Sequence, residues 1–361
     1  MHLAGLFEPL KLRGVTLRNR VGVSPMCQYS AEDGQFNDWH LVHLGSRAVG
    51  GAGLVIAEAT AVEARGRISP GDTGLWSDDQ IDGLARAMRF VKEHGAVPGL
   101  QLAHAGRKAS AARPWEDKGR HLANSEGGWD ILAPSAIPFG GNLDRTPREM
   151  TRDDIAVVRR AFVAATRRAL EAGVEWLEFH SAHGYLSHSF LSPLSNRRTD
   201  EYGGSLENRM RFTIETAAAM REAWPERLPF SVRLSCTDWL DGGWTIDDSV
   251  ALSRRLKEVG ADLIDCSSGF NTPEIRQIPF APGFQVPFAQ RIRAEVGIPT
   301  AAVGMITEPE QADAIIRNEQ ADVVLLARAM LQDPYWAAHA AKSLGLSAKA
   351  WMPVATGFWL K

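Results

Sequence analysis

The chain has 361 residues, of which 45% are hydrophobic and 23% charged, a balance typical of a globular protein with a buried core. Its formal net charge of -3 and the lack of a dense Lys/Arg run argue against nucleic acid or an anionic membrane as a partner. The first residues do not resemble a signal peptide and no apolar run reaches membrane-spanning length, so we expect a cytoplasmic protein.

Eight short apolar or β-rich runs recur along the chain, and a longer segment with helical periodicity follows each. The predicted strands are residues 20–26, 54–62, 97–104, 176–180, 230–235, 263–267, 300–304 and 323–327. This alternation predicts an α/β fold with parallel strands and crossover helices, and eight repeats favour a closed (β/α)8 TIM barrel. An open doubly wound sheet is the alternative, but the sequence lacks the G-x-G-x-x-G and G-x-x-x-x-G-K motifs.

The helices between these strands carry recognisable start signals. Polar capping residues precede the expected helices at Ser77, Thr151, Ser205, Thr245 and Thr307. Gly95 and Gly173 end the first two. His40 and His43 fall on a helix expected to begin near Asp38, and we interpret them as packing or surface groups.

We expect one domain over residues 1–361, with two segments that depart from the strand–helix rhythm. Residues 105–150 follow the third strand, are rich in Gly, Pro, Asn, Arg and Trp, and are too long for an ordinary connection. We expect this segment to cap the barrel. Residues 346–361 have an aromatic density unusual for a frayed terminus, so we expect this arm to dock on a surface.

Reactive groups of a TIM barrel lie at the carboxyl ends of its strands, because packed side chains fill the interior. Seven of the eight predicted strands place polar residues late in the strand or directly after it. These residues are Cys27, Gln28, Tyr29, Glu58, Thr60, Gln101, His104, His180, His183, Tyr185, Arg233, Ser267, Ser268 and Arg328. The seventh strand ends in Gly304 instead.

Two arginines and three cysteines need separate interpretation. Arg233 lies within an apolar strand, where a guanidinium needs an anionic or multiply accepting partner such as a flavin edge or a phosphate. Arg328 lies where barrels commonly bind phosphate, with a salt bridge as the alternative. Cys27, Cys236 and Cys266 are far apart, which suits reduced thiols better than disulfides or an iron–sulfur cluster, and each alone reads as a small core residue.

His180 and His183 form the sharpest local signal. Two imidazoles three residues apart could bind a metal, but the sequence shows no clear third ligand and no H-E-x-x-H motif, so we expect no metal. Two neutral imidazoles can instead donate to one carbonyl oxygen on which negative charge develops. Tyr185, whose ordinary pKa is about 10, would stay protonated and could give a proton to a carbon. His188 has no assigned role.

Five segments resemble the Old Yellow Enzyme family over nearly the whole chain. They are Ser24-Pro-Met-Cys-Gln-Tyr29, Glu58-Ala-Thr60, Gln101-Leu-Ala-His-Ala-Gly-Arg107, His180-Ser-Ala-His-Gly-Tyr-Leu186, and the long, highly specific run from Ser192 to Arg209. Cys27 with Tyr29, and the aromatic C-terminal arm, resemble the subgroup that includes xenobiotic reductase A.

The resemblance implies an FMN over the carboxyl mouth of the barrel and NADPH or NADH as the reductant, with both substrates using one flavin face in turn. The implied FMN-binding residues are Ser24, Pro25, Met26, Cys27, Ala59, Gln101, Arg233, Gly304, Ala327 and Arg328. Two positions depart from the family pattern. Ala327 replaces the usual glycine of the phosphate loop, and Val303 stands where close relatives can carry Trp.

The resemblance also implies site roles and a reaction. His180 and His183 would bind a substrate oxygen, Tyr185 would protonate the α-carbon, Cys27 would tune the flavin, and Tyr29 would line the substrate side. The expected function is an ene-reductase for small molecules such as enones, maleimides and nitro compounds. We expect a homodimer or homotetramer in which Trp359 reaches an active site, either its own or that of a neighbouring subunit.

Three alternatives stay open at this point. A metal-dependent lyase or hydrolase on the same barrel would use His180 and His183. A non-catalytic flavoprotein would keep the cofactor residues without turnover. A dienoyl-CoA reductase relative would need a cysteine cluster for iron and sulfur, which three scattered cysteines do not supply.

Overall fold

The computed structural model describes residues 5–360 and contains a closed, all-parallel barrel of eight strands. In chain order these are β3 (Val21–Val23), β4 (Leu54–Ala61), β5 (Val97–Ala103), β8 (Trp176–Ser181), β9 (Phe230–Ser235), β10 (Leu263–Ser267), β11 (Thr300–Ala302) and β12 (Val323–Leu326). The barrel closes where β12 pairs with β3. The predicted (β/α)8 TIM barrel is therefore confirmed, and each predicted strand overlaps an observed one.

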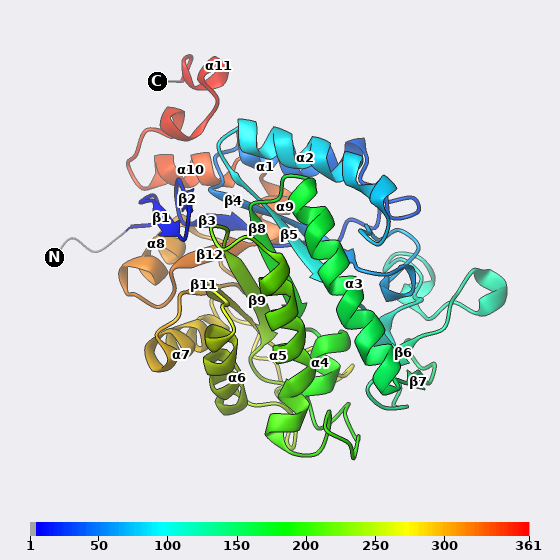
Figure 1. Ribbon diagram of the computed structural model, residues 1–361. Coiled ribbons are helices and arrows are strands. Elements are labelled where there is room, and N and C mark those ends of the chain that lie inside the picture. Colours follow the sequence, from blue (N-terminus) through cyan, green and yellow to red (C-terminus); the bar gives the residue numbers. More distant parts are fainter. Residues whose placement is uncertain (1–4, 361) are drawn as a thin grey trace.

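Helices surround the strands, as Figure 1 shows. The longer ones are α1 (Asp38–Val49), α2 (Ile81–Glu93), α3 (Arg152–Glu171), α5 (Leu206–Ala223), α6 (Ile246–Glu258), α7 (Val286–Val296), α8 (Pro309–Arg317) and α10 (Trp336–Ser343). The short ones are α4 (Leu186–Leu191), α9 (Arg328–Gln332) and α11 (Val354–Gly357). Single 3-10 turns span Ala64–Gly66, Asp78–Gln80, Gly106–Lys108, Asp117–Gly119, Asn124–Glu126 and Ala348–Trp351.

Three of the predicted caps act as expected. The side chains of Thr151, Ser205 and Thr245 each accept from a backbone N–H in the first turn of α3, α5 and α6. The short helix expected from Thr307 with Pro309 is α8, which does begin at Pro309, but its cap is the extended Glu308 and not Thr307. Proline fixes the first helical position and keeps the residue before it extended, so the start is set by the proline.

Strand register stacks polar residues into two layers of the barrel interior. Gln101 of β5 pairs with Glu178 of β8, and Glu178 with Ser231 of β9. One layer further toward the carboxyl ends, His180 of β8 pairs with Arg233 of β9, and Arg233 pairs with Asp265 of β10. Since side chains alternate along a strand, these two rows point to the same side and meet inside the barrel.

Two small strand pairs lie outside the barrel. The antiparallel hairpin of β1 (Leu10–Leu12) and β2 (Val15–Leu17) is bonded through the Gly14 amide to the carbonyl of Arg227, which precedes β9. The hairpin therefore lies at the amino ends of the strands. The parallel pair of β6 (Leu132–Ala133) and β7 (Arg148–Glu149) belongs to the long segment after β5.

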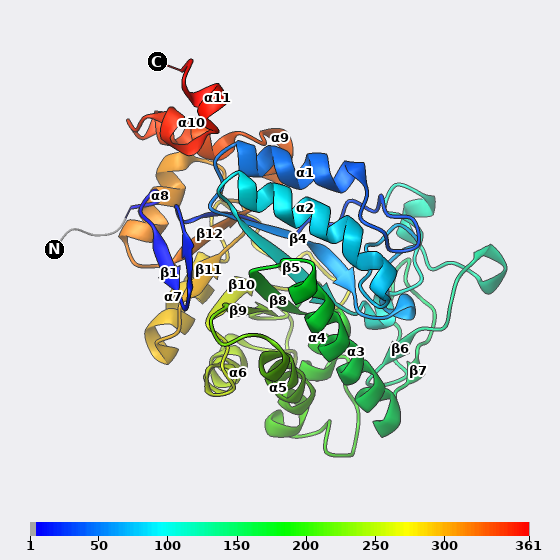
Figure 2. The same ribbon diagram turned by 45° about the horizontal axis from the view of Figure 1, so that its top comes forward.

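The segment from 105 to 150 and the C-terminal helices lie on opposite sides of the barrel. Figures 1 and 2 show β6 and β7 on one side, and β1, β2 and α11 on the other, in both views. At the C-terminal side the ring of Trp351 packs 5.1 Å from that of Phe7, so this part of the expected arm docks on the barrel. None of the helices formed by residues 5–360 is long and apolar enough to cross a membrane.

Candidate active site

A cavity of about 420 Å³ opens at the carboxyl ends of β10, β11 and β12. Ser267 ends β10, Gly304 follows β11, and Ala327 and Arg328 follow β12; all four line this cavity. Phenylalanines of the segment after β10 line it as well, at positions 270, 280 and 284. The cavity therefore combines a guanidinium and exposed loop backbone with an aromatic wall, at the end of the barrel where catalytic sites form.

Gly304 can only be a glycine in this setting. Its φ of +116° is a conformation that side chains rarely adopt, and an added Cβ would lie 2.6 Å from Nε2 of Gln285. Gln285 cannot move away cheaply, because its amide donates to the carbonyl of Val303 at 2.9 Å and accepts from the Ser268 hydroxyl at 2.6 Å. The loop after β11 thus brings bare backbone to the cavity.

The loop after β3 is held against neighbouring strands. The amide of Ser24 donates to the carbonyl of Leu326 on β12, and the amide of Gln28 donates to Oε1 of Glu58 on β4 at 2.9 Å. Between these anchors Pro25, Met26 and Cys27 are half-buried. Ala59, on the neighbouring β4, is small and buried. The loop therefore presents a weakly polar ledge, formed by residues 24–27, beside the mouth.

His180, His183 and Tyr185 come together at the end of β8. The ring centroids of His180 and His183 lie 5.2 Å apart, and those of His180 and Tyr185 lie 5.0 Å apart, both pairs edge to face. The Nδ1 atom of His180 accepts from the amide of Ala182, which leaves its proton on Nε2. Nε2 of His183 lies 2.7 Å from the Ser267 hydroxyl. The three residues predicted to act together thus lie side by side, with His180 between the other two.

Burial keeps all three of these groups uncharged near neutral pH. It lowers the pKa of both imidazoles well below the ordinary value, with the nearby Arg233 acting in the same direction. Burial also raises the pKa of the Tyr185 phenol well above its ordinary value. Neutral imidazoles and a protonated phenol are all hydrogen-bond donors, so the cluster suits an oxygen that gains negative charge.

The remaining predicted residues lie around this cluster. Tyr29 has a left-handed backbone (φ 51°), and its ring contacts Trp115 edge to face at 5.8 Å. Burial raises the pKa of the Cys27 thiol, and Asp72 and Glu58 add to that effect, so the thiol stays protonated. Trp359 is different: it is 79% exposed and contacts the ring of its neighbour Phe358, on the α11 side of the molecule.

Arg233 has a partner that sequence reasoning did not find. Its Nε lies 3.0 Å from Oδ2 of Asp265, and both side chains are buried. The contact is an ion pair without directed hydrogen-bond geometry, so Nε of Arg233 keeps an unused donor. Beneath it, Glu178 accepts from the Gln101 amide at 2.9 Å, and burial raises the pKa of Glu178. Arg233, Asp265 and Glu178 are all charged residues within largely apolar strands, and this pattern could have identified each of them. Only Arg233 was interpreted from it.

Lys108 is a second residue that the sequence did not single out. Its Nζ donates to the carbonyl of His183 at 2.9 Å and lies 4.8 Å from the centre of the Tyr185 ring. Burial, with a smaller effect from Arg107, lowers its pKa to about 7. Lys108 comes from the segment after β5, so its approach to β8 is set by tertiary structure.

His40 and His43 are buried packing groups, and the surface part of their interpretation is wrong. Nδ1 of His40 accepts from the amide of Asn37, which caps α1. Its Nε2 lies 3.7 Å from Oε2 of Glu58, the carboxyl group that also holds the loop after β3. Burial lowers the pKa of His40 to about 4 and raises that of Glu58 to about 8, so both are uncharged near pH 7.

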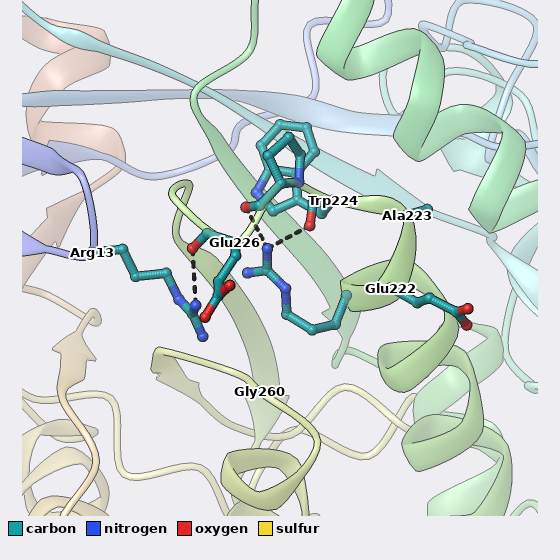
Figure 3. A pocket seen from close by; sticks show the side chains of 8 residues that line it. Arg13, Glu222, Ala223, Trp224, Glu226 and Gly260 are labelled. Atoms are coloured by element: carbon teal, nitrogen blue, oxygen red, sulfur yellow. Dashed lines mark hydrogen bonds between the residues drawn. The ribbon is translucent and has the colours of Figure 1, made fainter.

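A second hollow and a possible metal site were also considered, and among the described residues neither has free functional groups arranged for catalysis or metal binding. A more open hollow of about 560 Å³ lies at the amino ends of β9 and β10, where Figure 3 shows Arg13 bonded to the main-chain carbonyl of Glu226. Its guanidinia are already paired, Arg13 with Asp262 and Arg221 with the carbonyls of Trp224 and Leu228. Within residues 5–360 no three His, Cys, Asp or Glu side chains form a group that could hold a metal ion.

The residues at the mouth fit FMN. Arg328, the bare backbone at Gly304 after β11, and Ala327 after β12 suit a phosphate, and the unused Nε donor of Arg233 suits an electron-rich ring edge. The ledge of residues 24–27 suits the flat face of the ring. Ala327, where the family usually has glycine, lines the same cavity, so the replacement does not remove the loop from the site.

Comparison with known proteins agrees with this fit. The sequence profile of the NADH:flavin oxidoreductase / NADH oxidase family matches residues 5–347. The chain is 52% identical over 347 residues to an NADPH dehydrogenase of Geobacillus sp. (strain WCH70), covering 96% of each, and 48% identical over 341 residues to one of Bacillus velezensis, covering 94% and 95%.

Solved structures share the fold. Morphinone reductase superposes with a TM-score of 0.77 at 26% identity, covering 95% of this chain and 90% of that one. A 2-naphthoyl-CoA reductase superposes with a TM-score of 0.85 at 24% identity, and the present chain spans about half (52%) of its length. The chain therefore belongs to the NADH:flavin oxidoreductase / NADH oxidase family, and it is an NAD(P)H-dependent oxidoreductase that binds FMN.

Proposed function

We propose that this enzyme is an ene-reductase that reduces the C=C bond of α,β-unsaturated carbonyl or nitro compounds. The observation that carries the proposal is the cluster of His180, His183 and Tyr185 at the carboxyl mouth, where the His180 ring lies 5.2 Å from that of His183 and 5.0 Å from that of Tyr185. Two neutral donors and one protonated phenol are the groups that such a reduction needs beside a flavin.

The proposed FMN site uses the residues that converge on the mouth. Arg328, Ala327 and Gly304 would hold the phosphate, Arg233 and Gln101 the polar edge of the ring, and residues 24–27 with Ala59 its flat side. Bound FMN supplies the hydride equivalent that it has received from NAD(P)H. Every other requirement of the reaction falls on side chains of this chain.

His180 and His183 would bind the carbonyl or nitro oxygen of the substrate. Nε2 of His180 carries its proton, because Nδ1 accepts from the Ala182 amide. Both imidazoles stay neutral, so each donates without competing charge. As they draw electron density toward the oxygen, the β-carbon becomes electrophilic and accepts hydride.

Tyr185 would protonate the α-carbon. Its side chain is half-buried, burial raises the pKa of its phenol, and the Lys108 amino group lies 4.8 Å from its ring centre. A phenol that stays protonated in the resting enzyme can release its proton only to a strong base, such as a carbon that has just gained electron density. Cys27 would contact the ring of FMN, and Tyr29 would line the substrate side.

Finer features of the enzyme belong to the same proposal. NADPH is the proposed reductant, by analogy with the relatives named NADPH dehydrogenase, with NADH as the alternative. A cytoplasmic homodimer or homotetramer is proposed from the family resemblance, together with a resemblance to xenobiotic reductase A. Trp359 would contribute to the substrate pocket of a neighbouring subunit.

Anaerobic stopped-flow kinetics with separate half-reactions tests the proposal. In the first half-reaction NADPH should bleach the bound flavin, and in the second an enone, a maleimide or a nitroalkene should restore its colour. His180→Ala should slow the second half-reaction about 100- to 1,000-fold, the loss typical of one oxyanion donor, and leave the bound FMN content unchanged. Parallel loss of FMN binding and turnover would contradict the assigned role of His180.

A further inference from the structure

We infer that His188 is a positioning residue for the turn that carries His183 and Tyr185, and that Asp238 fixes the tautomer of His188. This inference deepens the proposed function and rests on it. His188 lies on α4 behind the turn, and its side chain is fully buried, so it does not contact the cavity at the mouth.

The turn after β8 has an unfavourable backbone conformation that neighbouring contacts must stabilise. His183 has φ 59° and Gly184 has φ 72°, two successive left-handed residues, and the first of them carries a side chain. Such a backbone is unfavourable for a residue that carries a side chain, and it persists only where surrounding contacts fix it. A Cβ on Gly184 would lie 2.4 Å from the carbonyl of Phe270, so the turn is pressed against the segment after β10.

Side chains hold this turn from three directions. The amide of His183 donates to the Ser235 hydroxyl at 2.9 Å, and the carbonyl of His183 accepts from Lys108. The amide of Gly184 donates to Nδ1 of His188 at 2.9 Å. The bond to His188 therefore fixes the peptide between the predicted oxygen-binding residue and the predicted acid.

The bond to Gly184 selects the tautomer of His188. Because Nδ1 accepts from an amide, it carries no proton, so the ring proton lies on Nε2. Nε2 lies 3.1 Å from Oδ1 of Asp238, and both side chains are fully buried. The geometry is bent and short of a directed hydrogen bond, so the contact is mainly electrostatic, yet it favours the N–H on that side.

Asp238 is itself fixed on the other side. Its Oδ2 accepts from the Ser192 hydroxyl at 2.5 Å and from the amide of Trp244 at 2.8 Å. Burial alone would raise its pKa, but His188, Ser192 and the Trp244 amide hold it below the ordinary value. An ionised Asp238 thus faces the N–H of His188, and the order Asp238, His188, Gly184 runs from the protein interior to the site.

Three substitutions of His188 distinguish the role of Nδ1, which accepts from Gly184, from that of Nε2, which faces Asp238. In His188→Asn the side-chain oxygen can take the place of Nδ1 and accept from Gly184. In His188→Gln the side-chain amide reaches toward Asp238 but leaves the Gly184 amide without its acceptor. His188→Leu removes both contacts. The positioning role predicts that Asn retains the rate of substrate reduction within a few-fold, whereas Gln and Leu lower it about 10- to 100-fold, as displacement of a catalytic group typically does.

The bound FMN content should be unchanged in all three variants, because His188 does not line the cavity at the mouth. The inference is overturned if Asn is as slow as Leu, if Gln behaves like the unsubstituted enzyme, or if all three react alike. If Leu does not fold, the comparison of Asn with Gln decides.

Two measurements on the chain itself do not depend on turnover. Residue-resolved hydrogen exchange, with and without FMN, should show the Gly184 amide exchanging about tenfold faster in Gln than in Asn, since one hydrogen bond is lost. In ¹⁵N NMR of histidine-labelled protein, the His188 signals are identified by their absence from the spectrum of the His188→Asn variant. In the unsubstituted protein these signals should show a proton on Nε2. A proton on Nδ1 would overturn the inference.

Tyr185→Phe in the same series separates this inference from the proposed function. If Tyr185→Phe leaves substrate reduction unchanged, the proposed acid role fails. If Tyr185→Phe slows substrate reduction while His188→Gln does not, the proposed function stands and the role of His188 fails.

Discussion

At the level of single residues, burial sets the protonation of nearly every polar group at the mouth. The imidazoles of His180 and His183 lose their charge, and the phenol of Tyr185 keeps its proton. Arg233 is balanced by Asp265 at 3.0 Å. The site therefore offers donors without adding much net charge, which suits the binding of both an uncharged enone and a charged nicotinamide nucleotide in turn.

Tyr185→Phe should leave flavin reduction by NADPH unchanged and slow enone reduction about 100-fold or more, the usual contribution of a general acid. The substitution removes only the hydroxyl, so the ring contact with His180 is kept. Stopped-flow measurement of the two half-reactions tests it. Tyr202→Phe is the matched control, because that hydroxyl bonds Glu215 away from the mouth and its loss should alter neither rate. An unaffected oxidative half-reaction in Tyr185→Phe would remove its role as acid.

Glu58→Gln should change how stability depends on pH. The pKa of Glu58 is about 8 in the folded chain, raised mainly by burial, against 4.5 as its ordinary value. The folded state therefore holds a proton that the unfolded state has lost between about pH 5 and 8. Since the unfolded state binds fewer protons there, the contribution of Glu58 is fully present below pH 4.5 and is lost as the pH rises through 8.

A glutamine in place of Glu58 cannot ionise and keeps an oxygen for the Gln28 amide. The difference in melting temperature between the FMN-free Glu58→Gln variant and the FMN-free unsubstituted protein should thus move in favour of the variant as the pH rises from about 5 to about 8. A difference that stays constant, or moves the other way, would show that Glu58 is already ionised in the folded protein.

At the level of elements, the strands could be predicted and their partners could not. The run Val323–Leu326 is entirely apolar, as a buried parallel strand requires, and Phe230–Ser235 has an apolar residue at every second position. All eight predicted strands overlap an observed strand. The sequence of such a run does not reveal which of its residues pair with which residues of the neighbouring strand. The pairing of Arg233 with Asp265, and of Gln101 with Glu178, appears only once the strands are aligned.

Short strands and contacts between distant segments could not be predicted from the sequence, for related reasons. The hairpin strands β1 and β2 have three residues each, too few to show a period. Burial of His40 and His43 depends on how α1 lies against β4, which the sequence of α1 does not reveal. The approach of Lys108 to His183 joins segments 75 residues apart. In contrast, His180, His183 and Tyr185 lie so close in sequence that their meeting could be predicted.

Arg107→Ala should loosen the segment from 105 to 150. The Arg107 guanidinium is 2% exposed and donates to the carbonyls of Ile137, Pro138 and Asn271, which ties this segment to itself and to the loop after β10. Loss of these bonds leaves buried carbonyls unpaired and should cost about 2–4 kcal/mol.

Limited proteolysis within residues 113–145 and the melting temperature measure this loss. Arg120→Ala is the control, since Arg120 lies in the same segment and its ion pairs with Glu126 and Asp117 are exposed. Arg120→Ala should lower the melting temperature far less than Arg107→Ala does, because water screens exposed ion pairs. Equal protease resistance of Arg107→Ala and the unsubstituted protein would show that other contacts hold the segment.

At the level of the whole molecule, the C-terminal helices and the segment from 105 to 150 lie on opposite sides of the barrel (Figure 2). Trp351 is docked beside Phe7 and against Gly51, whereas Phe358 and Trp359 are 73% and 79% exposed. Two adjacent, solvent-exposed aromatic side chains form an apolar patch of the kind that often marks an interaction site. Trp351 thus anchors the start of the arm, and the exposed Phe358 and Trp359 lie where a neighbouring subunit could bind them.

Truncation after Gly357 should therefore change substrate preference and leave the barrel intact. It removes Phe358 and Trp359 but keeps the Trp351 anchor, so the melting temperature and FMN content should be those of the full chain. Relative rates across enones, maleimides and nitro compounds should change, and Trp359→Ala should reproduce the change while Phe358→Ala, its exposed neighbour, should not. Sedimentation velocity measures the oligomeric state of the full chain and of each variant, because a change of that state alone would also alter the rates. An unchanged substrate profile in a truncated protein of unchanged oligomeric state would show that Trp359 enters no active site.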